Sequence, residues 1–261
     1  MPQGDPLGHF EQLVMLAILR QEAPASGAEI ARCLEDNLER DVRHSGILRI
    51  PETAMRFNDV VTDPVQLRDF IGEPPPPCVA KTITRLDIHC KSFIARSPFV
   101  LIASSNARGE MDISPKGDAP GFVRVLDDHT LAIPDRPGNR RADTFTNVLQ
   151  NSKIGLLFLI PGKTETLRIS GTAAIVRDVD LRESMAARGK VPDFALGLHV
   201  EEAFFHCSKC IIRSSLWTPE TWPALDGLPN LARTMIDAAA LPMPIEALEE
   251  IIRQDEVERL Y

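Results

Sequence analysis

Two short segments of the sequence contain basic and polar residues that can bind an anion, one at the end of an expected strand and one at the start of an expected helix. In the first, a lysine lies near the end of an expected strand; in the second, an asparagine and two arginines come just before an expected helix. Arginine donates paired hydrogen bonds to phosphate oxygens, and the unpaired N–H groups at a helix start also attract anions. The residues of this predicted phosphate site are Ser114, Pro115, Lys116, Asn139, Arg140 and Arg141.

The same residues could instead have an ordinary structural role, without any ligand. Lys116 could be a solvated lysine in a turn, and Arg140 could pair with Asp143 or Asp135. The 29 basic and 37 acidic residues give a net charge of −8, so binding of nucleic acid or of an anionic membrane through the overall field is not expected. An anion site must therefore be local.

Composition limits the class of protein. A chain of 261 residues with 44% apolar residues can bury one main core with appendages. No apolar run approaches the ~20 residues that cross a bilayer, and the N-terminus lacks the pattern of a signal peptide. The five cysteines are odd in number and scattered, which differs from the disulfide framework of a secreted protein. We therefore expect a cytoplasmic protein.

Strand patterns dominate the middle of the chain. Helical patterns cover 84–95, 144–150 and 181–188. Because the strands outnumber the helices between them, an antiparallel barrel fits better than a parallel α/β sheet. The expected strands are 99–103, 111–114, 122–126, 130–133, 154–160, 166–176 and 196–205.

The two ends of the chain have helical patterns and give the expected domain boundaries. Apolar residues recur at helical spacing in 9–20, a second helix is expected at 27–38, and a third at 63–71 with Thr62 or Asp63 as its cap. A stiff polyproline spacer is expected at 74–77, and the tail is helical from Leu231. The expected parts are a helical N-terminal extension (1–54), a barrel domain (55–227) and a C-terminal helical tail (228–261).

Four segments in a fixed order identify a family resemblance. They are Ser114–Asp118, Leu131–Arg141, Asn151–Phe158 and Glu165–Gly171. Their order and spacing resemble the pyridoxamine 5'-phosphate oxidase-related, FMN-binding split-barrel family, from about residue 59 to about residue 222. The resemblance implies a mainly β (α+β) fold, a six-stranded antiparallel split β-barrel with flanking helices. It also implies FMN as cofactor and a homodimer with two FMN molecules at the subunit interface.

The resemblance also implies roles for single residues. In the family, the lysine that matches Lys116 lies against the flavin, and basic phosphate ligands fall near Arg141, although this segment is a few positions longer here. Thr166 stands where a glutamine is usual, and Thr166 and Arg168 would face the ring edge and the ribityl chain; the structural alternative is a solvent-facing strand side. The residues expected to close the site are Lys209, Arg213 and Trp217.

The segment Cys207–Cys210 has the spacing of a redox or zinc motif, and His206 adjoins it. A structural zinc needs four ligands, and the only other cluster is His89-Cys90. A redox motif of this kind usually opens a helix in a thioredoxin-like setting, which the pattern lacks. We expect neither a metal site nor disulfide chemistry here.

The N-terminus carries a second, weaker resemblance. Its first 45 or so residues, from Leu7 to Leu19 and again at Gly27–Ile30, are similar to the start of PadR-type winged-helix regulators. The recognition helix and wing that should follow are missing, because the chain reaches Ile50-Pro51-Glu52 and then the barrel segment. A helical appendage is the simpler interpretation.

The function predicted from these patterns is an FMN-dependent oxidoreductase with an unknown small-molecule substrate. No residue is identified as catalytic. Pyridoxamine phosphate oxidase activity itself is not expected, because that enzyme's Arg-x-His motif is not evident in Arg213–Trp217. The alternatives are a non-catalytic FMN-binding or storage protein and a flavin-sensing transcriptional regulator.

Overall fold

The computed structural model describes residues 59–261, so the helices expected at 9–20 and 27–38 and the regulator-like segment lie outside the described residues. The chain divides into two compact units, Met1–Gly72 and Glu73–Tyr261. The described part of the first unit contains one helix, α3 (Pro64–Ile71). Asp63 caps it as predicted, because its side chain accepts a hydrogen bond from the Val65 N–H at 2.9 Å.

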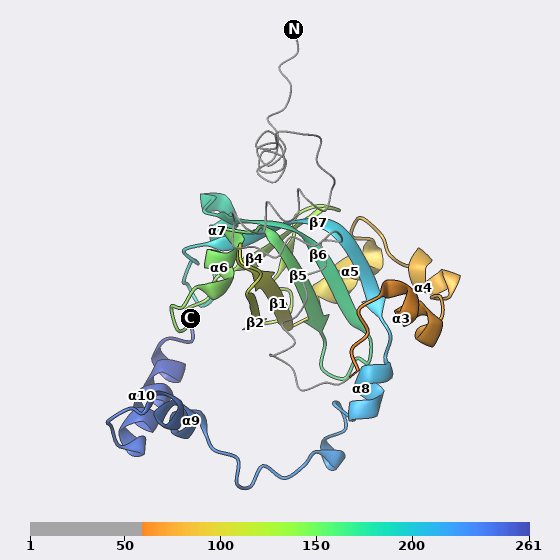
Figure 1. The fold of residues 1–261 in the computed structure, drawn as a ribbon. Coiled ribbons are helices and arrows are strands. Elements are labelled where there is room, and N and C mark those ends of the chain that lie inside the picture. Colours follow the sequence, from red (N-terminus) through yellow and green to blue (C-terminus); the bar gives the residue numbers. More distant parts are fainter. Residues whose placement is uncertain (1–58) are drawn as a thin grey trace, which may run out of the picture. The chain divides into compact units, whose positions relative to one another are not determined.

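The second unit is built on one antiparallel sheet of seven strands (Figure 1). The strands follow the order β2-β1-β5-β6-β7-β4-β3, with β2 and β3 at the two edges. This is the α+β split-barrel fold that the resemblance implies, but its count of six strands was wrong, because the strand pattern at 122–126 forms a short strand, Arg124–Val125. The strands are β1 (Phe99–Ser105), β2 (Met111–Gly117), β3 (Arg124–Val125), β4 (Thr130–Pro134), β5 (Lys153–Leu159), β6 (Thr166–Val176) and β7 (Ala195–His206).

The core lies inside the curved sheet and follows from the two-residue period of the strands. Every second residue of β1 and β5 is buried, as are Leu167 and Ile169 of β6. Phe158 and Leu131 are fully buried between the strands. Each such side chain contributes roughly 1.5–3 kcal/mol through burial, so the apolar faces hold the barrel together.

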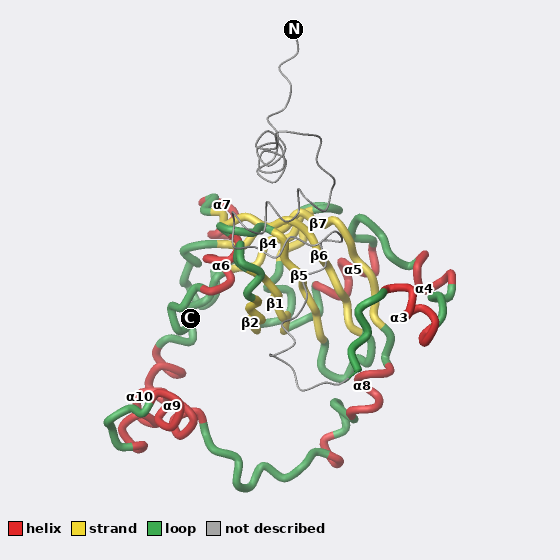
Figure 2. Tube along the Cα trace, in the orientation of Figure 1, coloured by secondary structure: helices red, strands yellow, loops and turns green. Residues whose placement is uncertain are grey.

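Most helices of this unit are short, and α6 packs against β1, β2 and β6 (Figure 2). The spacer expected at 74–77 was wrong: helix α4 begins at Pro76, where a proline needs no N–H partner. Helix α5 is shorter than expected because the Asp87 side chain caps it, accepting from the Cys90 N–H at 2.8 Å. The helices of this unit are α4 (Pro76–Ala80), α5 (Ile88–Ile94), α6 (Asp143–Val148), α7 (Val179–Ser184), α8 (Lys209–Ser214), η1 (Pro219–Thr221), α9 (Leu231–Ala239) and α10 (Ile245–Glu258). None of the described helices is long and apolar enough to cross a bilayer.

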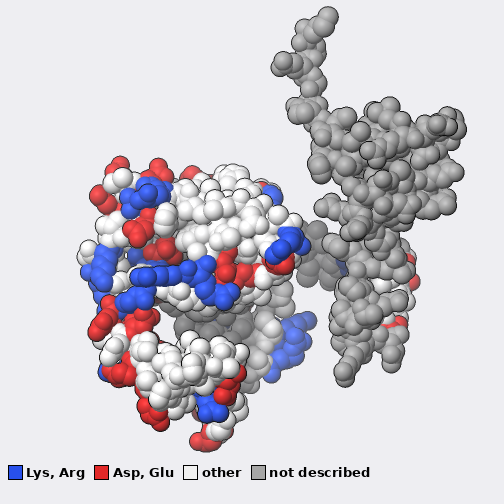
Figure 3. Space-filling model, turned by 60° about the vertical axis from the view of Figure 1, so that its left-hand side comes forward, with Lys and Arg blue, Asp and Glu red and all other residues white. Residues whose placement is uncertain are grey.

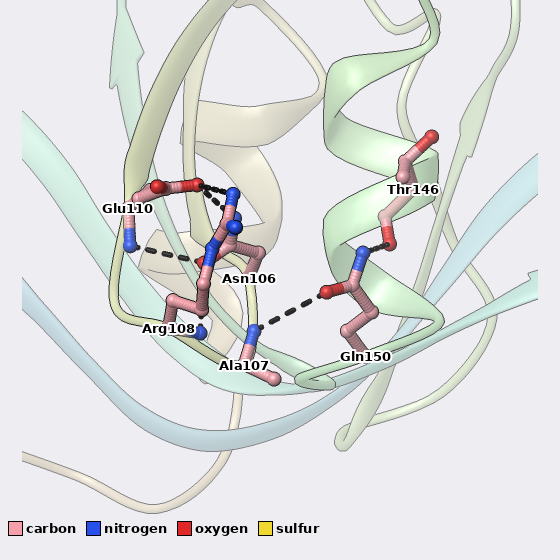
Figure 4. A network of polar contacts seen from close by, with 6 residues as sticks. All are labelled: Asn106, Ala107, Arg108, Glu110, Thr146 and Gln150. Atoms are coloured by element: carbon pink, nitrogen blue, oxygen red, sulfur yellow. Dashed lines mark hydrogen bonds and ion pairs between the residues drawn. The ribbon is translucent and has the colours of Figure 1, made fainter. Parts of the chain in front are cut away.

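Side-chain contacts fix the turn between β1 and β2 and join it to the end of α6 (Figure 4). Asn106 Oδ1 accepts from the N–H groups of Arg108 and Glu110 at 2.9 and 3.1 Å. Arg108 and Asn106 both donate to the Glu110 carboxylate, and these hydrogen bonds lower the pKa of that group. Gln150 accepts from the Ala107 N–H at 3.5 Å. The network fixes the start of β2, the strand that carries Ser114, Pro115 and Lys116.

Candidate functional site

The described residues enclose a cavity of about 890 Å³. Its wall comes from β1 and β2, from the segment between β4 and α6, from the loop before β7 and from the residues after α10. The volume falls within the range of roughly 300–1,000 Å³ that is usual for cofactor and small-molecule sites. The cavity therefore joins the two segments that the sequence singles out.

Five of the predicted site residues line this cavity. Lys116 and Ser114 lie on the same side of β2, and the Lys116 Nζ donates to the Ser114 Oγ at 3.1 Å. Pro115 points to the other side of the strand, is exposed and does not line the cavity. The other three lining residues are Asn139, Arg140 and Arg141.

The loop before α6 holds its arginines in an unusual backbone conformation. Arg140 and Ala142 have φ values of 62° and 57°, in the left-handed region that costs a residue with a side chain roughly 1 kcal/mol. The Asn139 Oδ1 accepts from the Arg141 N–H at 3.0 Å. Backbone strain of this kind is concentrated at functional sites.

The structure corrects the expected pairing of the two arginines. Arg141, not Arg140, pairs with Asp143, with 2.7 Å between Nε and Oδ2. Among the ion pairs of the described residues, Arg140 has none, so its guanidinium is available to a ligand. On the face drawn in Figure 3, Lys and Arg side chains form a band with Asp and Glu beside them, so both signs of charge share that surface.

A buried ion pair between Arg136, which lines the cavity, and Asp118, which does not, was missed by the sequence analysis. Arg136 Nε lies 2.6 Å from Asp118 Oδ2, and the Asp118 side chain is only 4% exposed. Burial would raise the pKa of Asp118, but hydrogen bonds from Tyr261, from the Ala119 N–H and from Arg136 outweigh it and lower the pKa. Asp118 directly follows β2 and Arg136 is the second residue after β4, so their pairing needs the folded sheet.

A pair of carboxylates in the same wall was also missed. Asp135 is half-buried beside Lys116 and Asp193, and all three line the cavity. Burial raises the pKa of Asp135, the charge of Asp193 adds to this effect, and Lys116 and Arg136 oppose it. A carboxyl group with a raised pKa in a cavity can hold or release a proton near a bound ligand.

Replacing Asp135 with asparagine should stabilise the protein at neutral pH. The pKa of Asp135 is higher in the folded protein than the value of about 4 expected in the unfolded chain. Its contribution to the free energy of unfolding is therefore fully present below about pH 4 and is lost as the pH rises through the pKa of the folded state. The Asp135→Asn variant should therefore melt at a higher temperature than the wild type at pH 7, with the gap closing toward pH 4. Exposed Asp226 offers the matched Asp→Asn control. A gap that persists unchanged at acid pH would contradict the assignment.

The remaining predicted site residues do not line the cavity. Thr166 is 4% exposed and pairs across the sheet with His206, and the Arg168 guanidinium lies 5.0 Å from the centre of the Phe204 ring. Trp217 donates from its Nε1 to a main-chain oxygen at 2.8 Å. The other two residues, on the exposed surface of α8, are Lys209 and Arg213.

The cysteines of the Cys-x-x-Cys segment are both exposed. Cys210 belongs to α8, a helix that the sequence analysis did not expect, and its thiol lies 4.0 Å from the main-chain oxygen of Cys207. In the part of the chain that the structure describes, no three His, Cys, Asp or Glu side chains gather as metal ligands would. Cys90 is a core residue, and burial raises its pKa to about 12.

The segment that forms most of the cavity is similar to a known protein family. Residues 86–207 match the family model described as pyridoxamine 5'-phosphate oxidase. The resemblance inferred from the sequence is confirmed for this segment. The match includes all the cavity residues from Ile102 to Leu196, whereas Glu258, Arg259 and Tyr261 lie beyond it.

Solved structures resemble the barrel segment, whereas no curated protein matches the sequence. HupZ from Group A Streptococcus is 25% identical, and the match covers 46% of this chain and 92% of that chain with a TM-score of 0.38. An FMN-binding protein from Syntrophomonas wolfei is 14% identical over 45% and 83% of the chains, with a TM-score of 0.37. The heme storage protein HutZ from Vibrio cholerae is 15% identical over 46% and 94%, with a TM-score of 0.35.

Proposed function

We propose that this protein is an FMN-binding flavoprotein that acts as an oxidoreductase on a small molecule. The observation that carries the proposal is the cavity in which Lys116, Arg140 and Arg141 meet within the segment that matches the oxidase family. Two arginines and a lysine suit a phosphate dianion, because guanidinium groups bind its oxygens in pairs and lysine adds a point charge.

The rest of the cavity wall fits a flat aromatic ring. Apolar side chains line the cavity together with the charged ones, and ring systems are usually held on apolar surfaces with a few polar groups for orientation. The lining described contains no histidine, cysteine or methionine, the usual axial ligands of haem iron. Tyr261, another possible ligand, donates its hydroxyl to Asp118. The apolar lining residues include Ile102, Ile133, Phe145, Val191, Phe194 and Leu196.

Bound FMN would supply hydride or electron transfer, and the residues of this chain would hold and orient it. The phosphate would be held by Arg140, Arg141 and Lys116, and Ser114 offers a hydroxyl next to the lysine. Asp135, with its raised pKa, is placed in the wall to take or give a proton. This carboxyl group is our candidate for acid–base work, which the sequence alone does not indicate.

We also propose a homodimer in which a second copy completes the site. Edge strand β2 exposes Met111 and Ile113 by 67% and 66%, and an exposed apolar edge strand is usually covered by another chain. A second copy would supply Arg168, Lys209, Arg213 and Trp217, whereas Thr166 is too deeply buried in its own sheet to reach another subunit.

The location proposed for the protein is the cytoplasm. Cys78, Cys207 and Cys210 are exposed free thiols, which persist in a reducing compartment. Fractionation of cells that produce the protein would test this point.

The absorption spectrum of the purified protein tests the proposed function. We expect a flavin spectrum, and the chromophore released by denaturation should have the mass of FMN. A haem spectrum would refute the proposal, and so would a colourless protein that takes up no FMN. Flavin that is bound but reoxidised by every acceptor no faster than free FMN would favour the storage alternative over the oxidoreductase.

A further inference from the structure

The last residue of α10 and two of the three residues after it form part of the cavity wall, although they lie outside the family match. We call residues 258–261 the strap. Its side chains Glu258, Arg259 and Tyr261 all line the cavity. Arg259 Nη2 donates to the Gly138 main-chain oxygen at 3.2 Å. The strap therefore contacts the same loop that carries the predicted phosphate ligands.

Tyr261 makes the most extensive contacts of the strap. Its hydroxyl donates to Asp118 Oδ1 at 2.7 Å, and the Lys190 ammonium donates to its main-chain oxygen. Two guanidinium groups lie over its ring, that of Arg136 at 5.9 Å and that of Arg188 at 4.6 Å from the ring centre. Cation–π contacts of this kind hold a ring in place without closing off its hydroxyl.

Asp118 is the point at which the strap meets the basic segments. The carboxylate accepts from both Arg136 and Tyr261, one on each oxygen. Asp118 directly follows β2, which carries Lys116, and Arg136 directly precedes the loop with Arg140 and Arg141. A movement of Tyr261 would therefore change the contacts of Asp118 and Arg136, which adjoin the two segments of the predicted phosphate site.

The strap is a wall of the cavity and does not fill it. About 890 Å³ remains free while Glu258, Arg259 and Tyr261 are in contact with the barrel. A cofactor-sized ligand fits within that volume, so ligand and closed strap can be present together. This argues for closure over a ligand and against competition with it.

We propose that the strap closes the cavity over the bound flavin and slows its release, with the hydrogen bond from Tyr261 to Asp118 as the latch. The inference rests on the proposed FMN site but concerns residues to which that proposal gives no role. Tyr261 acts here as a positioning residue, because it holds Asp118 and the strap rather than the flavin itself.

The latch should depend on pH. The hydrogen bond to Asp118, burial and the charge of Asp118 raise the pKa of Tyr261, while Arg188 and Arg136 oppose the rise. The charged groups that contact this tyrosine are Asp118, Arg136, Arg188 and Lys190. Loss of the phenol proton removes the donor and places two anions together. Flavin release should therefore accelerate as pH rises through the pKa of Tyr261.

Tyr261 is the only tyrosine in the chain, so its ionisation can be followed by ultraviolet absorbance without interference from another phenol. The wild type should titrate above the usual value of about 10, and Asp118→Asn should lower that value. Asp226→Asn is the control, because exposed Asp226 is remote from the cavity lining. A tyrosine that titrates alike in all three proteins would overturn the latch, whether or not FMN binds.

Flavin release gives the second arm of the test. After FMN is bound, dilution into excess apoflavodoxin-type flavin scavenger should show release from Tyr261→Phe roughly three- to tenfold faster than from the wild type at pH 7, with the gap closing at alkaline pH. Trp222→Phe, an exposed aromatic outside the cavity lining, should release FMN at the wild-type rate. Unchanged release from Tyr261→Phe would overturn the proposal, and slower release would show that the strap competes with the ligand. A wild type that binds no FMN refutes the proposed function instead.

Discussion

Replacing Arg140 and Arg141 together with alanine should weaken FMN binding about a hundredfold or more, yet leave riboflavin binding almost unchanged. Both side chains line the cavity, and charge-assisted hydrogen bonds to phosphate are roughly twice as strong as neutral ones. Riboflavin has the same ring system without the phosphate, so it does not use these two residues. Equilibrium titration of the apoprotein with each flavin, followed by flavin fluorescence, measures both affinities.

The control for this prediction is a pair of arginines outside the cavity lining. Arg233 and Arg253 are exposed and paired with neighbouring carboxylates on α9 and α10. Their double alanine variant should bind both flavins like the wild type. An equal loss of FMN and riboflavin in the Arg140 and Arg141 variant would show that the loop has collapsed, and unchanged FMN affinity would place the phosphate elsewhere.

Gly171→Ala should destabilise the barrel by roughly 3 kcal/mol, which lowers the melting temperature by about 6–12 °C. Gly171 lies at the irregularity where β6 shifts its register against β7. A Cβ at this position would stand 1.9 Å from the His199 main-chain oxygen, which cannot move aside as a side chain could. The two central strands would have to separate, so thermal unfolding followed by circular dichroism should detect the change.

Gly155 on the neighbouring strand β5 provides a matched control. Nothing lies within 4 Å of a Cβ built at Gly155, and Gly155 pairs directly with Ser170 of β6. Gly155→Ala should therefore melt within about 2 °C of the wild type. Equal melting temperatures for the two variants would contradict the close approach of β6 and β7 at Gly171.

The strands could be predicted from the sequence because their signal is local. The alternation of Leu167 and Ile169 with polar residues gave the bounds of β6, 166–176, without any knowledge of its neighbours. Helices α4 and α8 were missed for different reasons. Pro76 and Pro77 favour an extended spacer unless they fall in a first helical turn, and α8 has only six residues, too few for a clear helical period.

The structure brings only some of the predicted site residues together in the cavity, for a related reason. Lys116, Arg140 and Arg141 stand beside local signals, a strand end and a helix start, so residue type and position together identify them. Asp118 and Tyr261 are 143 residues apart, and no local pattern links them. Asp135 gains its raised pKa only from burial and from neighbours that the fold supplies. Contacts of this kind depend on the topology of the sheet.

The most direct test of the central claim is a comparison of FMN and riboflavin binding to the wild-type apoprotein. If the basic cavity holds a flavin phosphate, FMN should bind with one molecule per subunit and at least about a hundredfold more tightly than riboflavin. Competition by free inorganic phosphate should weaken FMN binding and leave riboflavin binding unaffected. Equal affinities for the two flavins, or no binding of either, would contradict the account.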